Sequence, residues 1–360
     1  MSAAQPAAMI GGTVDVAANS AFDEARLIAY LSGRILEFSG SVRVQKFEGG
    51  QSNPTFLLST PDARYVLRRK PAGVLLKSAH AVDREYRVTK ALFEAGLPIA
   101  EPLVLCEDDD VIGTMFYVMR HVPGRSFWDP RMPGLDPAER AAIYDSANDT
   151  LARLHLVDYA AIGLGDYGRP GNYFARQISR WTRQYEASRT RDIPEMERLI
   201  AWLPGAVPDT GDRTTIIHGD YSFHNLLVHP TEPRVSAVID WELSTLGDPL
   251  GDLTYHMMEW SRPAGVDVRG TLQGADLSAL GIPTAQEYAQ RYCERTGFDG
   301  DPNHPFYRAF NLFRVAAILQ GIAGRARDGV QTGANAEEII SRVEPLARAA
   351  WIAAQEAGAS

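Results

Sequence analysis

The pattern of apolar residues changes once along this chain, near residue 122, and that change constrains the possible folds more than any other feature. Before it, short alternating stretches are separated by turn residues, which is typical of antiparallel strands. These stretches span residues 42–47, 55–59, 65–69, 103–106 and 115–120, and one helical stretch spans 79–95. The first part of the chain therefore predicts a small β-rich lobe with one main helix.

After residue 122, apolar residues mostly recur at the spacing of amphipathic helices. The predicted helices span residues 136–156, 173–188, 194–203, 285–296, 305–325 and 336–354, and predicted strands at 215–217, 226–228 and 235–239 interrupt them. A chain of 360 residues is longer than one hydrophobic core usually supports. We expect an α+β protein with a flexible arm at 1–20, an N-terminal lobe at 21–121 and a larger, mostly helical C-terminal lobe at 122–360.

Charge and hydropathy limit the partners of the chain. The formal net charge of −9 argues against broad binding to nucleic acid or to anionic membranes, because both need a basic surface. No run of about 18 apolar residues occurs, and no basic segment precedes an apolar one near Met1. We expect a cytoplasmic protein with no nucleic-acid and no membrane partner. A phosphorylated ligand is compatible with the acidic balance, because Mg²⁺ and local cations can hold phosphate.

Three oxygen-bearing side chains are spaced in a way that favours phosphoryl transfer. Asn225 follows Asp220 after four intervening residues, and a predicted hairpin then leads to Asp240. A short loop and a tight hairpin can bring these three side chains together. Phosphoryl transfer needs a carboxylate that accepts the proton of the attacking hydroxyl and oxygen ligands that hold Mg²⁺ against the phosphates. The spacing supplies all three groups.

The same segment resembles a known family. Its Asp-x-x-x-x-Asn step matches the catalytic loop of protein kinases, but His-Gly-Asp at 218–220 and Asp-Trp-Glu at 240–242 replace His-Arg-Asp and Asp-Phe-Gly. In these replacements the chain resembles the aminoglycoside phosphotransferase and choline kinase superfamily over roughly residues 42–256. The runs 226–235 and 240–249 are most similar to the kinase-like N-terminal domain of acyl-CoA dehydrogenase family members ten and eleven.

The resemblance implies a bilobal protein-kinase-like fold and an ATP-dependent phosphotransferase, a small-molecule kinase that uses ATP and Mg²⁺. It implies that Asp220 is the catalytic base and that Asn225 and Asp240 are Mg²⁺ ligands. His218 is expected to pack beneath the loop and bond backbone groups. Asp252 is expected to brace the loop from the start of a helix.

The resemblance also implies a nucleotide site in the N-terminal lobe. The loop expected over the ATP phosphates consists of Gly49, Gly50, Gln51, Ser52 and Asn53. Arg68 stands where the superfamily has a phosphate-binding lysine, with Lys70 as the alternative cation and Glu85 as the helical partner. Backbone groups near Met119 and His121 are expected to bind the adenine.

The acceptor is expected to be a small molecule with a hydroxyl group, and the resemblance favours a hydroxyacyl-CoA or a hydroxy acid. Helical residues that could line its pocket are Tyr173, Phe174, Arg180, Trp181, Arg314 and Arg325. Amphipathic helices carry such residues for packing as well. The sequence predicts neither the exact acceptor nor the oligomeric state.

Two other functions compete with this one. The first is a metal-dependent hydrolase that uses His218, Asp220, His224 and Asp240 as ligands, since transition-metal hydrolases favour such sets. It leaves Asn225 and the β-rich lobe without a role. The second is a non-catalytic nucleotide-binding pseudokinase, suggested by the missing lysine. The complete Asp-Asn-Asp set favours a phosphotransferase over both.

Overall fold

The computed structural model describes residues 12–16, 22–48, 53–71, 81–209, 213–266, 270–327 and 336–360. The chain divides into two compact units. The first unit comprises Met1–Ser126, Tyr159–Leu164 and His224–Ser244, and the second comprises Phe127–Asp158, Gly165–Phe223 and Thr245–Ser360. In the described part of the chain, no helix is both long enough and apolar enough to cross a membrane.

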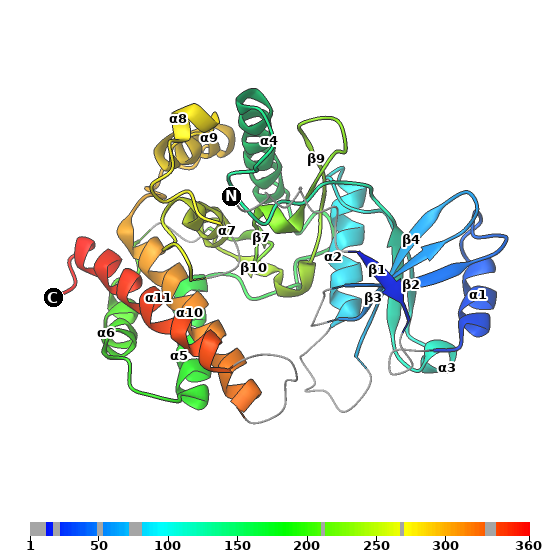
Figure 1. Ribbon diagram of the computed structural model, residues 1–360, viewed down its shortest axis with the longest axis horizontal. Helices are drawn as coiled ribbons and strands as arrows, with labels where there is room; N and C mark the ends of the chain where they lie inside the picture. Colours follow the sequence, from blue (N-terminus) through cyan, green and yellow to red (C-terminus); the bar gives the residue numbers. More distant parts are fainter. Residues whose placement is uncertain are drawn as a thin grey trace. The chain divides into compact units, whose positions relative to one another are not determined.

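The first unit is built on a six-stranded antiparallel sheet with strand order β1-β2-β3-β4-β6-β5 (Figure 1). Its strands are β1 (Thr13–Asp15), β2 (Arg43–Phe47), β3 (Thr55–Ser59), β4 (Arg64–Arg69), β5 (Pro102–Cys106) and β6 (Phe116–Arg120). In the register, Leu67 of β4 faces Phe56 on one side and Val118 on the other. The central strands β3, β4 and β6 therefore supply the apolar centre of this unit.

The two faces of the sheet carry different helices (Figure 1). Helix α1 (Glu24–Ser32) and the short helix α3 (Asp109–Ile112) belong to the core that contains Leu58, Tyr65 and Leu67. Side chains alternate along a strand, so Arg68 lies on the other face, where helix α2 (Val82–Glu94) packs. Glu85 belongs to the buried stripe of α2 that otherwise consists of Val82, Val88, Thr89 and Leu92.

A hairpin from later in the chain also belongs to the first unit. Strands β8 (Leu226–Val228) and β9 (Val235–Val238) pair antiparallel, and the amide of Val238 donates to the Pro98 carbonyl at 2.8 Å. Arg125 and Val228 exchange backbone hydrogen bonds of 2.7 and 2.9 Å. The predicted boundary after residue 121 left this hairpin in the C-terminal lobe, and these backbone bonds explain why it groups with the first unit instead.

Strand β1 lies within the stretch that the sequence predicted to be an arm. It pairs with β2, and Asp15 lies 3.7 Å from Arg43. Three residues are too few to show an alternating pattern. The edge of the sheet, rather than the local sequence, specifies this strand.

The second unit is mostly helical. Its elements are α4 (Pro137–His155), α5 (Tyr173–Ser188), α6 (Pro194–Trp202), α7 (Leu250–His256), α8 (Leu277–Leu280), α9 (Ala285–Thr296), α10 (Pro305–Arg327) and α11 (Ala336–Glu356), with β7 (Thr215–Ile217) and β10 (Thr245–Gly247). Helices α10 and α11 lie side by side (Figure 1), and Phe310, Phe313, Leu346 and Ala350 are buried. Strand β7 pairs antiparallel with β10, and β7 leads into the loop that carries Asp220.

Candidate active site

One guanidinium in the first unit is surrounded by three carboxylates. Arg68 Nε lies 3.0 Å from Glu85 Oε2, and Arg68 Nη2 lies 2.7 Å from Asp240 Oδ1 and 3.5 Å from Glu242 Oε2. The Arg68 side chain is 13% exposed and that of Glu85 is 2% exposed. This charge cluster, defined as Arg68, Glu85, Asp240 and Glu242, contains more negative than positive charge.

Glu85 is held at the bottom of the charge cluster by two further donors. Asn53 Nδ2 donates to Oε1 and the Tyr117 hydroxyl donates to Oε2, each at 3.1 Å. Burial raises the pKa of Glu85, Arg68 lowers it, and the nearby Asp240 and Glu242 raise it again, to about 7. The pKa of Tyr117 is also raised, by burial and by the adjacent Glu85. Glu85 is thus fixed in place and orients Arg68.

The hairpin brings Asn225 and Asp240 to the same end of its two strands. The amide of Ile239 donates to the carbonyl of Asn225 at 3.0 Å, and Leu226 pairs with Val238. Asp240 has φ of 66°, a left-handed conformation that Asp tolerates better than most residues. Its backbone turns there into the 3₁₀ helix Trp241–Leu243, and its carboxylate reaches Arg68.

The second unit holds Asp220 in a braced loop. Gly219 adopts φ of 86°, and the fully buried Asp252 accepts hydrogen bonds from the amides of His218 and Gly219. His218 is also fully buried, and its Nδ1 accepts from the amide of Asp220 at 3.2 Å. The contacts of His218 and Asp252 have the form that the sequence predicted for a support beneath the loop.

Asp252 is itself held by a buried chain of polar side chains. His155 Nε2 lies 3.4 Å from Asp252 Oδ2, and His155 Nδ1 lies 2.6 Å from the Tyr292 hydroxyl. Burial alone would raise the pKa of Asp252, but the bonds and charges of His155, His218 and the Gly219 amide lower it below its ordinary value. Asp252 therefore stays ionised as a fixed acceptor for the loop.

The structure brings together some of the predicted residues and leaves others apart. Arg68, Glu85, Asp240 and Asn53 lie in one connected set, and Asn225 lies at the end of the same hairpin as Asp240. Asp220 belongs to the other unit, so its convergence with Asn225 and Asp240 stays a prediction. Gly49, Gly50, Gln51 and Ser52 lie outside the described residues.

Two cations were candidates for the phosphate-binding position, and they have different partners. Lys70 Nζ lies 3.8 Å from Asp83 Oδ1, whereas Arg68 pairs with Glu85 and Asp240. Lys70 follows the last residue of β4, and its partner Asp83 precedes Glu85, the partner of Arg68, on α2. Arg68 is the cation that the charge cluster holds.

Backbone amides at the edge predicted to bind adenine already donate hydrogen bonds to other backbone carbonyls. The amide of His121 donates to the Arg64 carbonyl at 3.0 Å, and that of Arg120 donates to the Glu101 carbonyl at 2.9 Å. Met119 pairs with Val66 on one side and with Pro102 on the other. A backbone donor for adenine would therefore have to come from another residue than His121.

Comparison with known proteins decides the family. The model of the phosphotransferase enzyme family matches residues 43–291, which include the charge cluster and the braced loop. This chain belongs to the phosphotransferase enzyme family.

Relatives and solved structures agree with this family. The chain is 43% identical to acyl-CoA dehydrogenase family member 10 of Mus musculus over 97% of its own length and 33% of that protein, and 44% identical to member 11 of Gallus gallus over 93% of its length and 44% of that protein. It thus spans less than half of these relatives. A crystal structure of a putative aminoglycoside phosphotransferase from Ralstonia eutropha is 49% identical, with a TM-score of 0.84 over 93% of this chain and 99% of that one.

More distant structures share the fold alone. Aminoglycoside phosphotransferase APH(4)-Ia, solved in a ternary complex with ADP and hygromycin B, is 17% identical, with a TM-score of 0.58 over 91% of this chain and 98% of that one. The predicted kinase-like α+β fold and the predicted superfamily are both confirmed.

The aromatic residues predicted near the acceptor are core residues in this member of the family. Tyr173, Phe174 and Trp181 are each about 5% exposed or less.

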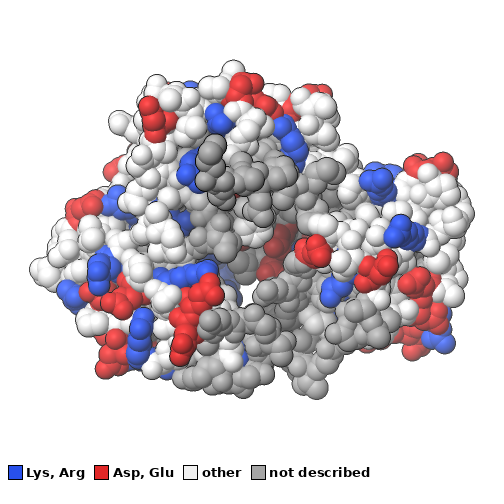
Figure 2. Space-filling view, viewed as in Figure 1, with Lys and Arg blue, Asp and Glu red and all other residues white. Residues whose placement is uncertain are grey.

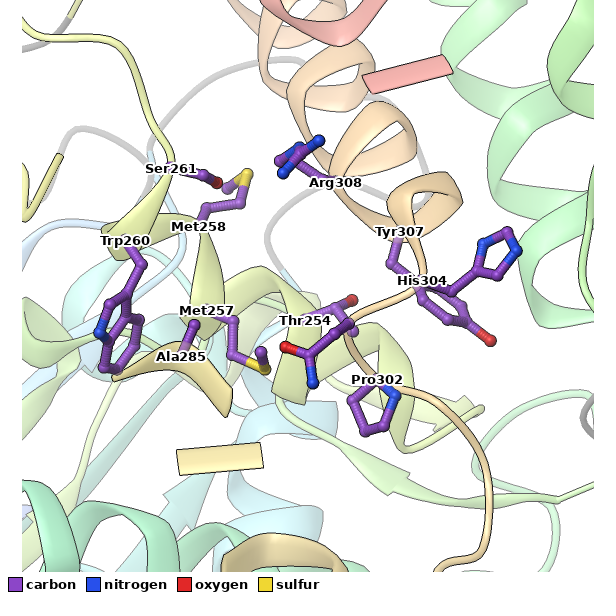
Figure 3. A pocket seen from close by; sticks show the side chains of 11 residues that line it. Thr254, Met257, Met258, Trp260, Ser261, Ala285, Pro302, His304, Tyr307 and Arg308 are labelled. Carbon is purple, nitrogen blue, oxygen red and sulfur yellow. The ribbon is translucent and has the colours of Figure 1, made fainter. Parts of the chain in front are cut away.

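A nearby cavity has a volume of about 80 Å³, and Figure 3 shows the side chains around it. Metabolite pockets usually measure several hundred cubic ångströms, so this cavity is too small for the acceptor. It is lined by residues of α7, α10 and their neighbours, among them Thr254, Met257, Met258, Trp260, Tyr307 and Arg308.

Charged side chains of both signs occur on the surface of the described residues. Figure 2 shows acidic and basic side chains interspersed on one face, with no broad basic patch among the residues that are described there. Over the described ranges, no group of three or more His, Cys, Asp or Glu side chains is arranged to hold a metal ion.

The sequence analysis missed one participant, Glu242, and one contact of Arg314, which it had named only as a residue that could line the acceptor pocket. Glu242 is the third carboxylate of the charge cluster, and Arg314 donates to the Gly219 carbonyl. Glu242 could have been found, because it occupies the last position of the Asp-Trp-Glu motif. No local pattern connects Arg314 with a loop that lies almost a hundred residues earlier.

Proposed function

We propose that this chain is an ATP-dependent phosphotransferase that moves the γ-phosphoryl group of ATP to a hydroxyl of a small metabolite, a hydroxyacyl-CoA or a hydroxy acid. The observation that carries the proposal is the charge cluster, in which Arg68 is oriented by the buried Glu85 beside the hairpin end that bears Asn225 and Asp240. Membership of a phosphotransferase family supports it.

In this proposal Asp220 is the catalytic base. The acceptor oxygen bonds to the γ-phosphorus, the bond from that phosphorus to the β,γ-bridging oxygen breaks, and ADP leaves. Asp220 takes the proton of the acceptor hydroxyl. His218 and Asp252 hold the loop backbone through the amides of residues 218–220, which keeps the base in position.

The residues present fit a magnesium ion. Mg²⁺ usually binds one or two carboxylates together with substrate phosphates, and Asn225 and Asp240 supply an amide oxygen and a carboxylate. The charge cluster has three carboxylates for one guanidinium, so added positive charge is favourable there. When bound, Mg²⁺ would neutralise charge that develops on the phosphates.

Arg68 takes the role of a phosphate-binding cation. Its guanidinium can bind phosphate oxygens with two parallel hydrogen bonds, which a lysine cannot do. Glu85 keeps it extended along the sheet. Phosphate oxygens would then compete with Asp240 for Nη2, which frees the carboxylate for the metal.

The acceptor class rests on the relatives. Those with more than 40% identity are named acyl-CoA dehydrogenase family members, which supports an acyl-type acceptor that carries a hydroxyl. A distant protein of this fold was solved with ADP and hygromycin B, which supports a small-molecule acceptor. Residence in the cytoplasm stays a prediction from the sequence.

The test is an acceptor panel with a mass readout. The protein is incubated with ATP, Mg²⁺ and hydroxyacyl-CoAs, free hydroxy acids, amino alcohols or aminoglycosides, and products are searched for the mass of one added phosphoryl group. We expect a hydroxyacyl-CoA or hydroxy acid to gain it, and Asp220→Ala to lower the rate by about 100-fold or more. Unchanged transfer in Asp220→Ala would overturn the catalytic assignment.

The same panel separates the alternatives. Phosphate release that needs Zn²⁺ or Mn²⁺ but no nucleotide would favour the hydrolase. Nucleotide binding without consumption of ATP by any acceptor would favour the pseudokinase.

A further inference from the structure

Arg314 is a buried arginine directly beside the loop that carries Asp220. It lies on α10, is 4% exposed, and its Nη2 donates to the carbonyl of Gly219, the residue before Asp220. Both residues belong to the second unit. The hydrogen bond to the Gly219 carbonyl therefore places Arg314 next to the proposed catalytic base.

The rest of the Arg314 guanidinium is not satisfied by protein. Its Nε and Nη1 are buried and have no hydrogen-bond partner among the residues that the structure describes. Its Cζ lies 4.8 Å from the ring centroid of Tyr255 and 5.7 Å from that of Trp181. Aromatic faces stabilise the positive charge, but they leave the in-plane N–H groups unpaired.

No carboxylate neutralises this arginine within the described ranges. None of the ion pairs there includes Arg314, although arginines elsewhere in the second unit, such as Arg295 and Arg262, pair with acidic side chains. Asp252, which lies close in the same loop support, already accepts from two amides. Buried charges are normally paired, so an unpaired one adjacent to a reactive loop indicates a ligand of opposite charge.

A second cation lies near Arg314. Arg180 on α5 has an exposed side chain, but desolvation of its guanidinium by nearby protein atoms and the charge of Arg314 lower its pKa. Two arginines that repel each other in the free protein would both gain from a shared anion. Trp181, the next residue along α5, is the aromatic neighbour of both guanidinium groups.

We infer that Arg314 and Arg180 form an oxyanion site beside Asp220, which binds a carboxylate or phosphoryl group of the acceptor close to its reactive hydroxyl. The inference rests on the proposed function, because it assigns the site to the acceptor. The ligand class is a small hydroxylated molecule with an oxyanion near the hydroxyl. The oxyanion has two chemical sources, the acceptor's own acidic group or the phosphoryl group that has just been transferred to it.

The direct test uses simple anions and needs no acceptor. The full chain is labelled with ¹⁵N-arginine, and its Nε–Hε resonances are followed by NMR while acetate or inorganic phosphate replaces chloride at constant ionic strength. Arg314→Lys identifies the Arg314 resonance by its loss. We expect that resonance to shift with a saturable curve.

A pair of variants on one helix controls this titration. Arg180→Gln should weaken the binding of the anion by about tenfold, the effect of one hydrogen bond to a charged group. Arg183→Gln removes another exposed arginine of α5 and should leave the curve unchanged. A resonance that does not move, or that moves equally in both variants and without saturation, would overturn the inference.

Kinetics with a hydroxy acid and its methyl ester then identify the source of the oxyanion. If it is the acceptor's own group, Arg180→Gln raises KM for the acid and not for the ester. If it is the transferred phosphoryl group, Arg180→Gln lowers kcat for both. If the wild type and Arg180→Gln had the same KM and kcat with both the acid and the ester, the proposed site would be contradicted.

The two proposals can fail separately. Saturable binding at Arg314 together with full transfer by Asp220→Ala would remove the proposed catalytic base and keep the anion site. Loss of transfer in Asp220→Ala without any anion binding at Arg314 would keep the proposed catalytic base and remove the anion site.

Discussion

Two buried carboxylates in this molecule have pKa values shifted in opposite directions. Asp252 of the second unit is fully buried, and its pKa lies below the ordinary value, whereas Glu85 of the first unit is almost as buried and its pKa is raised to about 7. Asp252 faces two amide donors and His155. Glu85 shares one guanidinium with Asp240 and Glu242.

The difference indicates a division of work. The carboxylate of Asp252 is balanced by its amide donors and His155 without a ligand, which suits a support that fixes a loop. The charge cluster is short of positive charge, which suits a site that receives a metal ion with its nucleotide. In both regions a carboxylate is buried, but only the carboxylates of the charge cluster lack enough positive charge to balance them.

The largest stability effect is expected at Asp252, because both oxygens of its carboxylate accept hydrogen bonds from backbone amides. Asp252→Asn replaces an oxygen by an NH₂ group, so at least one of the amides of His218 and Gly219 loses its partner. We expect the free energy of unfolding to fall by about 3 kcal/mol, measured by urea denaturation.

Glu242→Gln is the matched control in the charge cluster. Glu242 is 26% exposed and 3.5 Å from Arg68, so the expected loss is below about 1 kcal/mol. Equal losses in the two variants would contradict the contrast between the two regions.

The next effect is the pH dependence that Glu85 gives to stability. Its folded pKa of about 7 exceeds the ordinary value of 4.5, so its contribution is complete below about pH 4.5 and is lost as pH rises through about 7. Between these values the wild type should lose up to about 1.4 kcal/mol per pH unit relative to Glu85→Gln.

Urea unfolding at a series of pH values between 4.5 and 8 measures this slope. Asp83→Asn, on the same helix but with its side chain 44% exposed, should follow the wild type. If Glu85→Gln and the wild type gave parallel curves, Glu85 would not carry an elevated pKa.

The smallest effect is expected for Lys70, the cation that directly follows β4. Lys70 is 29% exposed and pairs loosely with Asp83, so Lys70→Ala should change stability by less than about 0.5 kcal/mol. The affinity of Lys70→Ala for the ATP analogue AMP-PNP, measured by calorimetry, should stay within about twofold of the wild-type affinity. A large loss of affinity would move the phosphate-binding role from Arg68 to Lys70.

The sequence predicted the elements of this fold well wherever apolar residues recur over several turns or strands. Helix α5 and helix α9 have the predicted bounds, as do strands β3, β7 and β8. Strand β10 and helices α3 and α8 were missed, because three or four residues are too short for a periodic pattern. Grouping of the β8–β9 hairpin with the first unit depends on long-range backbone bonds to Pro98 and Arg125 that no local pattern encodes.

The candidate site shows the same limit. The positions of Arg68 and Glu85 could be predicted, because strand alternation and helix periodicity put them on facing surfaces. The hydrogen bond between Arg314 and Gly219 depends on tertiary packing, and so does the 3.8 Å ion pair between Lys70 and Asp83. Sequence spacing identifies which residues can react, whereas packing decides which cation each carboxylate receives.

The central claim is that the charge cluster, with Asn225, receives a metal ion together with nucleotide. Calorimetric titration of AMP-PNP into the wild type and into Asp240→Asn, each with Mg²⁺ and with EDTA, tests it most directly. The account predicts that Mg²⁺ tightens binding to the wild type by about tenfold or more and that Asp240→Asn loses most of this difference. Equal affinity of the wild type with Mg²⁺ and with EDTA would contradict it.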